Sequence, residues 1–74
     1  MPDININYPK ISLKAARVNA NLSQKEAAER LGITPGTLRS YEEGETVPNW
    51  ETVKSIEEIY RFPMDYIFFA RKLA

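Results

Sequence analysis

The sequence predicts a small all-α domain of five helices, and three observations support this prediction. Apolar residues recur at the helical period of about 3.6 positions. Residues that cap helices stand before these apolar stretches, and glycines stand where two of the helices would end. With 74 residues, 43% of them hydrophobic, the chain has enough apolar side chains for one core and therefore one domain.

The compact domain is expected over residues 10–74, behind an N-terminal arm of residues 1–9. The arm alternates Ile4, Ile6 and Tyr8 with polar residues, which suits an extended segment, and it could equally be a flexible tail. Such an arm could reach DNA or a partner, pair as strands across a dimer, or stay disordered. The sequence leaves all of these open.

The first helix is predicted over residues 11–20, because Leu13, Ala16 and Ala20 share one face at the helical period. Arg17 lies on the same face. Since a buried guanidinium needs an anionic partner, this arginine is expected to pair with an acidic residue from another helix.

The second and third helices are marked by their caps. A capping box that begins at Ser23 opens a helix over residues 24–31, which ends at Gly32. Thr34 is the expected N-cap of a third helix over residues 35–43, whose first position is a proline. The short connection between these two helices has the spacing of a helix-turn-helix.

Asn49 is expected to cap a fourth helix over residues 50–60, and a fifth helix is predicted from about Met64 onward. The spacing of Tyr41 and Trp50 predicts that both rings pack in the core rather than stack on bases. The fifth helix has more apolar surface than a short terminal helix needs to bury, so it either closes the core or forms a dimer interface. The candidate interface residues are Met64, Ile67, Phe68, Phe69 and Leu73.

The composition excludes several classes of function. Cysteine and histidine are both absent, so we expect no disulfide, no zinc or other metal site and no histidine general base. No catalytic residue and no cofactor are predicted, and the chain is not expected to be an enzyme. Apolar runs are too short for a signal peptide or a membrane span, which predicts a cytoplasmic protein without a membrane partner. Ten basic and ten acidic residues cancel, so any nucleic-acid binding must depend on local charge.

The third helix is predicted to present one face to solvent and another to the core. Its inward face includes Glu42, so we predict that Glu42 and Arg17 meet as a bidentate ion pair joining the first and third helices. The predicted outward residues are Pro35, Gly36, Arg39, Ser40 and Glu43.

The stretch "LSQKEAAERLGITPGTLRSYEEGETVPNWETV", residues 22–53, resembles the lambda-repressor-like family of Cro/C1-type, or XRE-type, helix-turn-helix proteins. The shared features are Leu-Ser-Gln at the start of the second helix, Leu-Gly-Ile-Thr at the turn and Tyr-Glu-x-Gly at the end of the third. The resemblance implies a five-helix domain that places its third helix in the DNA major groove, usually as a dimer on a palindromic operator.

The resemblance also implies roles for individual residues. Gln24 is similar to the family glutamine that holds a backbone phosphate. Flanking phosphate contacts are implied at Lys25, Thr34 and Thr46, and the Arg17–Glu42 pair matches an internal ion pair of the family. The implied base-reading residues are Pro35, Gly36, Thr37, Arg39 and Ser40.

The chain departs from the family pattern at several of these positions. Pro35 and Gly36 stand where relatives carry polar residues, so direct readout is expected to fall mainly on Arg39 and Ser40, with guanine the natural target of the arginine. Glu43 and Glu45 place negative charge beside a polyanion, which should weaken binding.

The predicted function is sequence-specific binding of double-stranded DNA by a transcriptional regulator, a repressor of phage, plasmid or bacterial type that acts as a homodimer. The alternative is an antitoxin-like or adaptor module that uses the same fold mainly to bind a protein. Such a partner would contact the acidic edge at residues 42–45 or the arm at residues 4–8.

Overall fold

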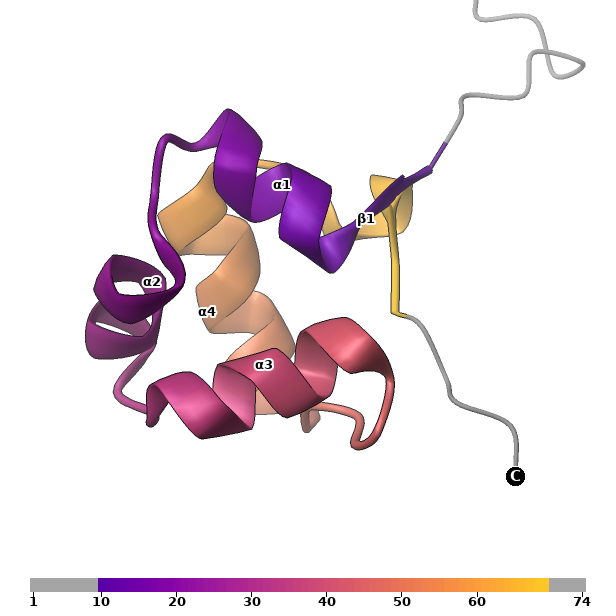
Figure 1. The fold of residues 1–74 in the computed structure, drawn as a ribbon. Helices are drawn as coiled ribbons and strands as arrows, with labels where there is room; N and C mark the ends of the chain where they lie inside the picture. The colour runs from indigo at the N-terminus through magenta and orange to yellow at the C-terminus, as the bar shows by residue number, and fades with distance from the viewer. Residues whose placement is uncertain (1–9, 70–74) are drawn as a thin grey trace, which may run out of the picture.

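The computed structural model describes residues 10–69, which form four α-helices, a 3-10 turn and two short strands (Figure 1). In Figure 1, α1 lies in front of the upper part of α4, α3 crosses in front of its lower part, and α2 lies to the left of α4. In chain order the elements are β1 (Ile11–Ser12), α1 (Leu13–Asn19), α2 (Gln24–Leu31), α3 (Pro35–Glu43), α4 (Trp50–Tyr60), η1 (Met64–Tyr66) and β2 (Ile67–Phe68).

The caps predicted for α2 are present. The Ser23 hydroxyl accepts from the backbone N–H of Glu26 at 3.0 Å, and the Glu26 carboxylate accepts from that of Ser23 at 2.9 Å. The bond from the Ser23 backbone N–H, with a smaller contribution from the Ser23 side chain, lowers the pKa of the Glu26 carboxyl group. The helix ends at Gly32, whose φ of 72° lies in the left-handed region that glycine adopts without strain.

The ends of α3 and α4 are also set by local chemistry. Thr34 accepts from the backbone N–H of Thr37 at 3.1 Å, and α3 ends at Gly44, which has a φ of 78°. Asn49 accepts from the backbone N–H of Thr52 at 2.9 Å at the start of α4. The predicted bounds of α2, α3 and α4 are therefore confirmed.

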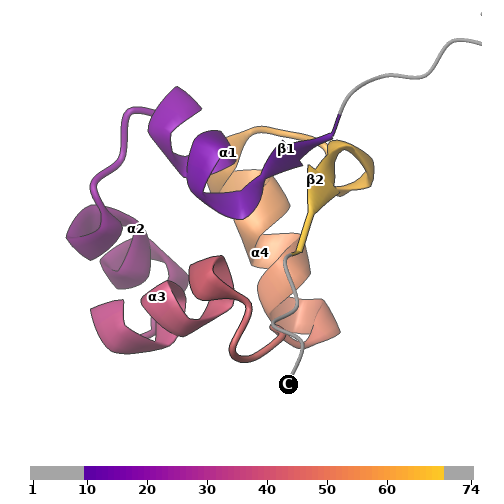
Figure 2. The same cartoon turned by 45° about the vertical axis from the view of Figure 1, so that its right-hand side comes forward.

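The all-α prediction is wrong at the two ends of the described chain. Residues 64–66 form one 3-10 turn in place of a fifth helix, and β2 then pairs in parallel with β1, with Ile67 opposite Ile11 (Figure 2). Pro63 holds an extended backbone, and the β-branched and aromatic residues after Tyr66 favour a strand once a partner strand is available. The first helix is shorter than predicted, because Ser12 is extended and caps it.

The predicted arm of residues 1–9 and the candidate interface residue Leu73 lie outside the described residues. Within residues 10–69, no helix is long and apolar enough to cross a bilayer.

The core is formed where all four helices and β2 meet. Leu38 and Ile56 are completely buried, and the small side chains of Ala27 and Ala28 let α2 pack closely against its neighbours. The buried apolar residues are Leu13, Ala16, Leu22, Ala27, Ala28, Leu38, Ile56, Tyr60 and Ile67.

Trp50 is 62% exposed, so its predicted place in the core is wrong. Trp50 is the first residue of α4 and precedes buried Ile56 by six positions. At about 100° for each residue, the two side chains lie about 120° apart around the helix axis. Tyr41 does pack against the core, partly buried.

Tyr60 lies at the end of α4 and is 4% exposed. Among residues 10–69, its hydroxyl has no hydrogen-bond partner. Burial, with a smaller contribution from the Glu42 carboxylate, raises the pKa of Tyr60 from 10.0 to about 12.

We expect Tyr60→Phe to leave the free energy of unfolding at pH 7 unchanged or to raise it by up to about 1 kcal/mol, because the substitution removes a buried hydroxyl that lacks a protein partner. From pH 10 to about pH 12 the unfolded wild-type chain releases a proton that the folded chain retains, so wild-type stability falls with rising pH. Phenylalanine has no proton to release, so the free energy of unfolding of Tyr60→Phe should not include this fall. Urea unfolding of both proteins across this range measures the difference, and parallel pH profiles would contradict the expectation.

Candidate nucleic-acid interface

The turn between α2 and α3 fixes the angle of the two helices. After left-handed Gly32, the backbone N–H of Ile33 donates to the carbonyl of Ala28 at 3.0 Å, and the Ile33 side chain packs against the core. Leu38 anchors the middle of α3 in that core. The opposite face of α3 is consequently turned to solvent.

Arg17 and Glu42 meet beneath this face. The Arg17 Nε donates to Glu42 Oε2 at 2.7 Å and Nη2 donates to Oε1 at 3.3 Å, which is a bidentate pair of the predicted kind. A third donor, Nη1, bonds the carbonyl of Leu22 at 2.9 Å. The side chains are 9% and 5% exposed, so the pair is largely shielded from water.

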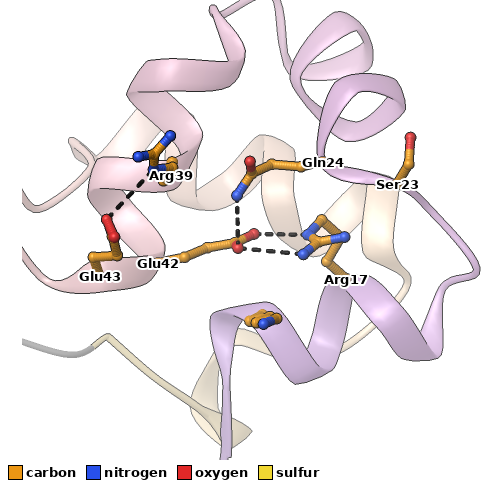
Figure 3. Close-up of a pocket in the computed structure, with 7 residues that line it drawn as sticks. Arg17, Ser23, Gln24, Arg39, Glu42 and Glu43 are labelled. Atoms are coloured by element: carbon orange, nitrogen blue, oxygen red, sulfur yellow. Dashed lines mark hydrogen bonds and ion pairs between the residues drawn. The ribbon is translucent and has the colours of Figure 1, made fainter.

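Gln24 joins the same cluster from the first position of α2. Its Nε2 donates to Glu42 Oε1 at 3.1 Å, so one carboxylate links residues from α1, α2 and α3 (Figure 3). The predicted phosphate contact is therefore held in place by the internal ion pair. This bond was not predicted from the sequence, because it depends on how α2 lies against α3.

An open depression of about 490 Å³ lies where α1, the start of α2 and the second half of α3 meet (Figure 3). Its lining residues are Lys14, Arg17, Ser23, Gln24, Arg39, Glu42 and Glu43. Arg39 and Glu43 form an ion pair at 3.6 Å. Three cations face two anions, and Lys14 has no ion-pair partner within the described residues. Lys14 was not predicted as a site residue. Its position on α1, one turn before Arg17, could have indicated that it lies near the same depression.

The predicted base-reading residues lie along the outer side of α3. Pro35, Gly36 and Arg39 are exposed, and Thr37 and Ser40 are partly buried. A Cβ atom built on Gly36 would meet only the Thr34 hydroxyl, at 3.9 Å, so the surface there is open.

The other predicted phosphate contacts do not line the depression. Lys25 lies on α2, Thr34 precedes α3 and Thr46 follows it. Lys25, Thr34 and Thr46 are all exposed. The hydroxyl groups of Thr34 and Thr37 are hydrogen-bonded to each other at 2.9 Å.

The candidate dimer residues occupy different environments. Phe68 is 47% exposed, whereas Ile67 is 3% exposed and belongs to the core, so Ile67 does not offer a surface for a second copy. Met64 and Phe69 are partly buried. Two further apolar side chains that were not predicted to be exposed are Val47, in the loop before α4, at 51%, and Trp50, the first residue of α4, at 62%.

The profile of a helix-turn-helix family matches residues 13–67, from the start of α1 through the first residue of β2. The chain belongs to the Cro/C1-type (XRE) helix-turn-helix family of DNA-binding transcriptional regulators. This is a family of regulators rather than enzymes.

Curated relatives agree with this assignment. The HTH-type transcriptional regulator ImmR of Bacillus subtilis is 38% identical over 55 residues, which cover 74% of this chain and 43% of ImmR. The cryptic phage CTXphi transcriptional repressor RstR of Vibrio cholerae is 33% identical over 52 residues, which cover 70% of this chain and 47% of RstR. The chain thus spans about half the length of these relatives. No solved structure matches it significantly.

We expect Arg17→Ala and Glu42→Ala each to lower the free energy of unfolding by roughly 3 to 5 kcal/mol, because each leaves the other charge buried without its partner. The double variant should lose clearly less than the sum, which urea unfolding in a double-mutant cycle measures. The exposed Arg39–Glu43 pair is the matched control, with an expected coupling of about 0 to 1 kcal/mol. Additive losses at Arg17 and Glu42 would show that their contact does not stabilise the fold.

Proposed function

We propose that this chain binds double-stranded DNA by placing α3 in the major groove, and that it represses transcription as part of a phage, plasmid or bacterial control system. The observation that carries the proposal is the orientation of α3, which Leu38 anchors on one side while the opposite side stays open. Recognition helices of helix-turn-helix proteins present side chains to base edges from such a face. Two relatives are named as a transcriptional regulator and a transcriptional repressor, which supports the proposed role in transcription.

Gln24 is the proposed central phosphate contact. Its Nε2 carries two N–H groups, and the bond to Glu42 uses one of them. The other remains for a phosphate oxygen, with the amide already oriented before DNA arrives. Flanking phosphate contacts are proposed at Lys25, Thr34 and Thr46.

Arg39 is the proposed main reader of bases, since it is the one cation of α3 and lies on its open face. A guanidinium matches O6 and N7 of guanine in the major groove. Pro35, Gly36 and Thr37 offer apolar surface or a methyl group near the start of the helix, and Ser40 offers a hydroxyl.

A homodimer is proposed to read two half-sites, with contacts made by the exposed apolar side chain of Phe68 and by its neighbours Met64 and Phe69. Contiguous exposed apolar side chains indicate a contact surface more strongly than a single one does, so the proposal depends on Phe68 together with these neighbours. Two copies of one surface give a two-fold symmetric assembly, which suits half-sites about one helical turn apart, roughly 34 Å.

DNA binding is tested by salt dependence and by two variants. Affinity for duplexes selected from a random pool should fall steeply from about 50 to 200 mM salt, with a log-log slope of about −0.9 for each phosphate contacted. Arg39→Ala should cost about 1 to 3 kcal/mol on selected duplexes and relax preference at one base pair, whereas Gln24→Ala should weaken all sequences similarly. Equal losses for both variants on every sequence would remove Arg39 from base reading.

For the dimer, we expect Phe68→Glu to shift sedimentation of the chain from dimer toward monomer, because the carboxylate would be buried against a second copy. Val18→Glu is the matched control, since Val18 is 54% exposed and lies in the last turn of α1, whereas β1, the partner of β2, adjoins the first turn. A dimer that persists in Phe68→Glu, or a wild-type chain that is monomeric with and without DNA, would contradict the proposal.

Protein binding is the second candidate function. Glu43 and Glu45 are exposed at the end of α3 and beyond it, where they oppose the approach of phosphate and would favour a basic protein surface. Absence of binding to duplex DNA at low salt would favour this alternative.

A further inference from the structure

Arg39 and Glu43 stand one helical turn apart on the open face of α3. The closest approach joins Arg39 Nε to Glu43 Oε2 at 3.6 Å, and the side chains are 68% and 51% exposed (Figure 3). An exposed pair at this spacing contributes about 0 to 1 kcal/mol to folding, and arginine before glutamate is the less favourable order. The fold therefore gains little from this contact.

The contact matters more for the proposed interface. Arg39 is the one cation on α3, and Glu43 cancels its charge at the place where a polyanion would dock. A carboxylate here lowers the general affinity for DNA. Any benefit of Glu43 to the interface therefore has to lie in discrimination between sequences.

We propose that Glu43 is a specificity-determining residue that positions Arg39 for base reading. This inference rests on the proposed function, in which Arg39 reads guanine. A guanidinium paired through Nε keeps the N–H groups of both terminal nitrogens, and these can reach O6 and N7 of guanine while Glu43 remains paired.

At a site without guanine, Arg39 gains affinity only by turning toward a phosphate. Doing so separates it from Glu43 and leaves the carboxylate unpaired beside the DNA backbone, where exclusion of water strengthens the repulsion. Glu43 thus penalises the use of Arg39 as a general phosphate contact. Specificity of this kind comes from a cost placed on the wrong partner.

The test compares the full chain with Glu43→Gln, Arg39→Ala and the double variant. The probes are duplexes selected by the wild-type chain, the same duplexes altered at the base pair that depends on Arg39, and unselected random duplexes. Glu58→Gln is the matched control, because Glu58 is an exposed glutamate on α4 that does not line the depression. Urea midpoints equal to that of wild type establish that the variants are folded.

Glu43→Gln should bind random duplexes about two- to fivefold more tightly, with a salt slope steeper by about 0.9 as Arg39 takes up one phosphate. Its discrimination at the Arg39-dependent base pair should fall about two- to fivefold. In the Arg39→Ala background, Glu43→Gln should leave discrimination unchanged. Glu58→Gln should keep wild-type discrimination.

Two results overturn the inference while leaving DNA binding intact. Wild-type discrimination in Glu43→Gln would show that the carboxylate is only repulsive, and an equal loss of discrimination in the Arg39→Ala background would show that Glu43 reads a base by itself. If the wild-type chain selects no duplex and binds none at low salt, the proposed function fails first, and this inference fails with it.

Discussion

The shielded carboxylate of Glu42 is the point on which the geometry of this domain depends. It accepts from Arg17 on α1 and from Gln24 at the start of α2, and it projects from α3 itself. Arg17 adds a bond to the Leu22 carbonyl, which fixes the connection between α1 and α2. Such a cluster contributes little net stability over apolar packing, but it permits few alternative arrangements of the three helices. Helix α3 therefore keeps one orientation relative to the α2 terminus.

That single orientation suits a surface that must match a rigid duplex. A binding residue carried on helices, with its own hydrogen bonds already made, loses little conformational freedom when its ligand arrives. Gln24, the proposed phosphate contact, would meet this description, because its amide is bonded to Glu42. The outer face of α3 is sparse by comparison, with a proline and a glycine in its first turn and one cation near its middle. This face therefore has few polar side chains, but one that adjoins it, Gln24, is already oriented by a hydrogen bond.

The sequence predicted most of the helices because their ends depend on neighbouring residues. The caps at Ser23, Thr34 and Asn49 and the stop at Gly32 act within a few positions, so local reading finds them. The strand pair could not be found in this way, since Ile11 and Ile67 meet only after the chain has folded. Trp50 was misplaced because it directly follows the cap residue Asn49, and it lies about 120° around α4 from buried Ile56.

The candidate site was predictable in part. The inward turn of Arg17 and Glu42 followed from helical periodicity, and the outward positions of α3 followed from the same wheel. Lys14 and the bond between Gln24 and Glu42 depend on how α1 lies against α2 and α3, which no single helix encodes. The burial of Ile67, a candidate for the dimer surface, likewise follows from strand pairing rather than from local pattern.

Gly36 has a consequence for how such a regulator changes over evolutionary time. Nothing inside the domain needs a glycine there, because a Cβ atom would meet only one hydroxyl at ordinary contact distance. A side chain can therefore begin at this site without displacing the interior. If Gly36 lies against base edges as proposed, one substitution there would change the preferred DNA sequence while the scaffold stays unaltered.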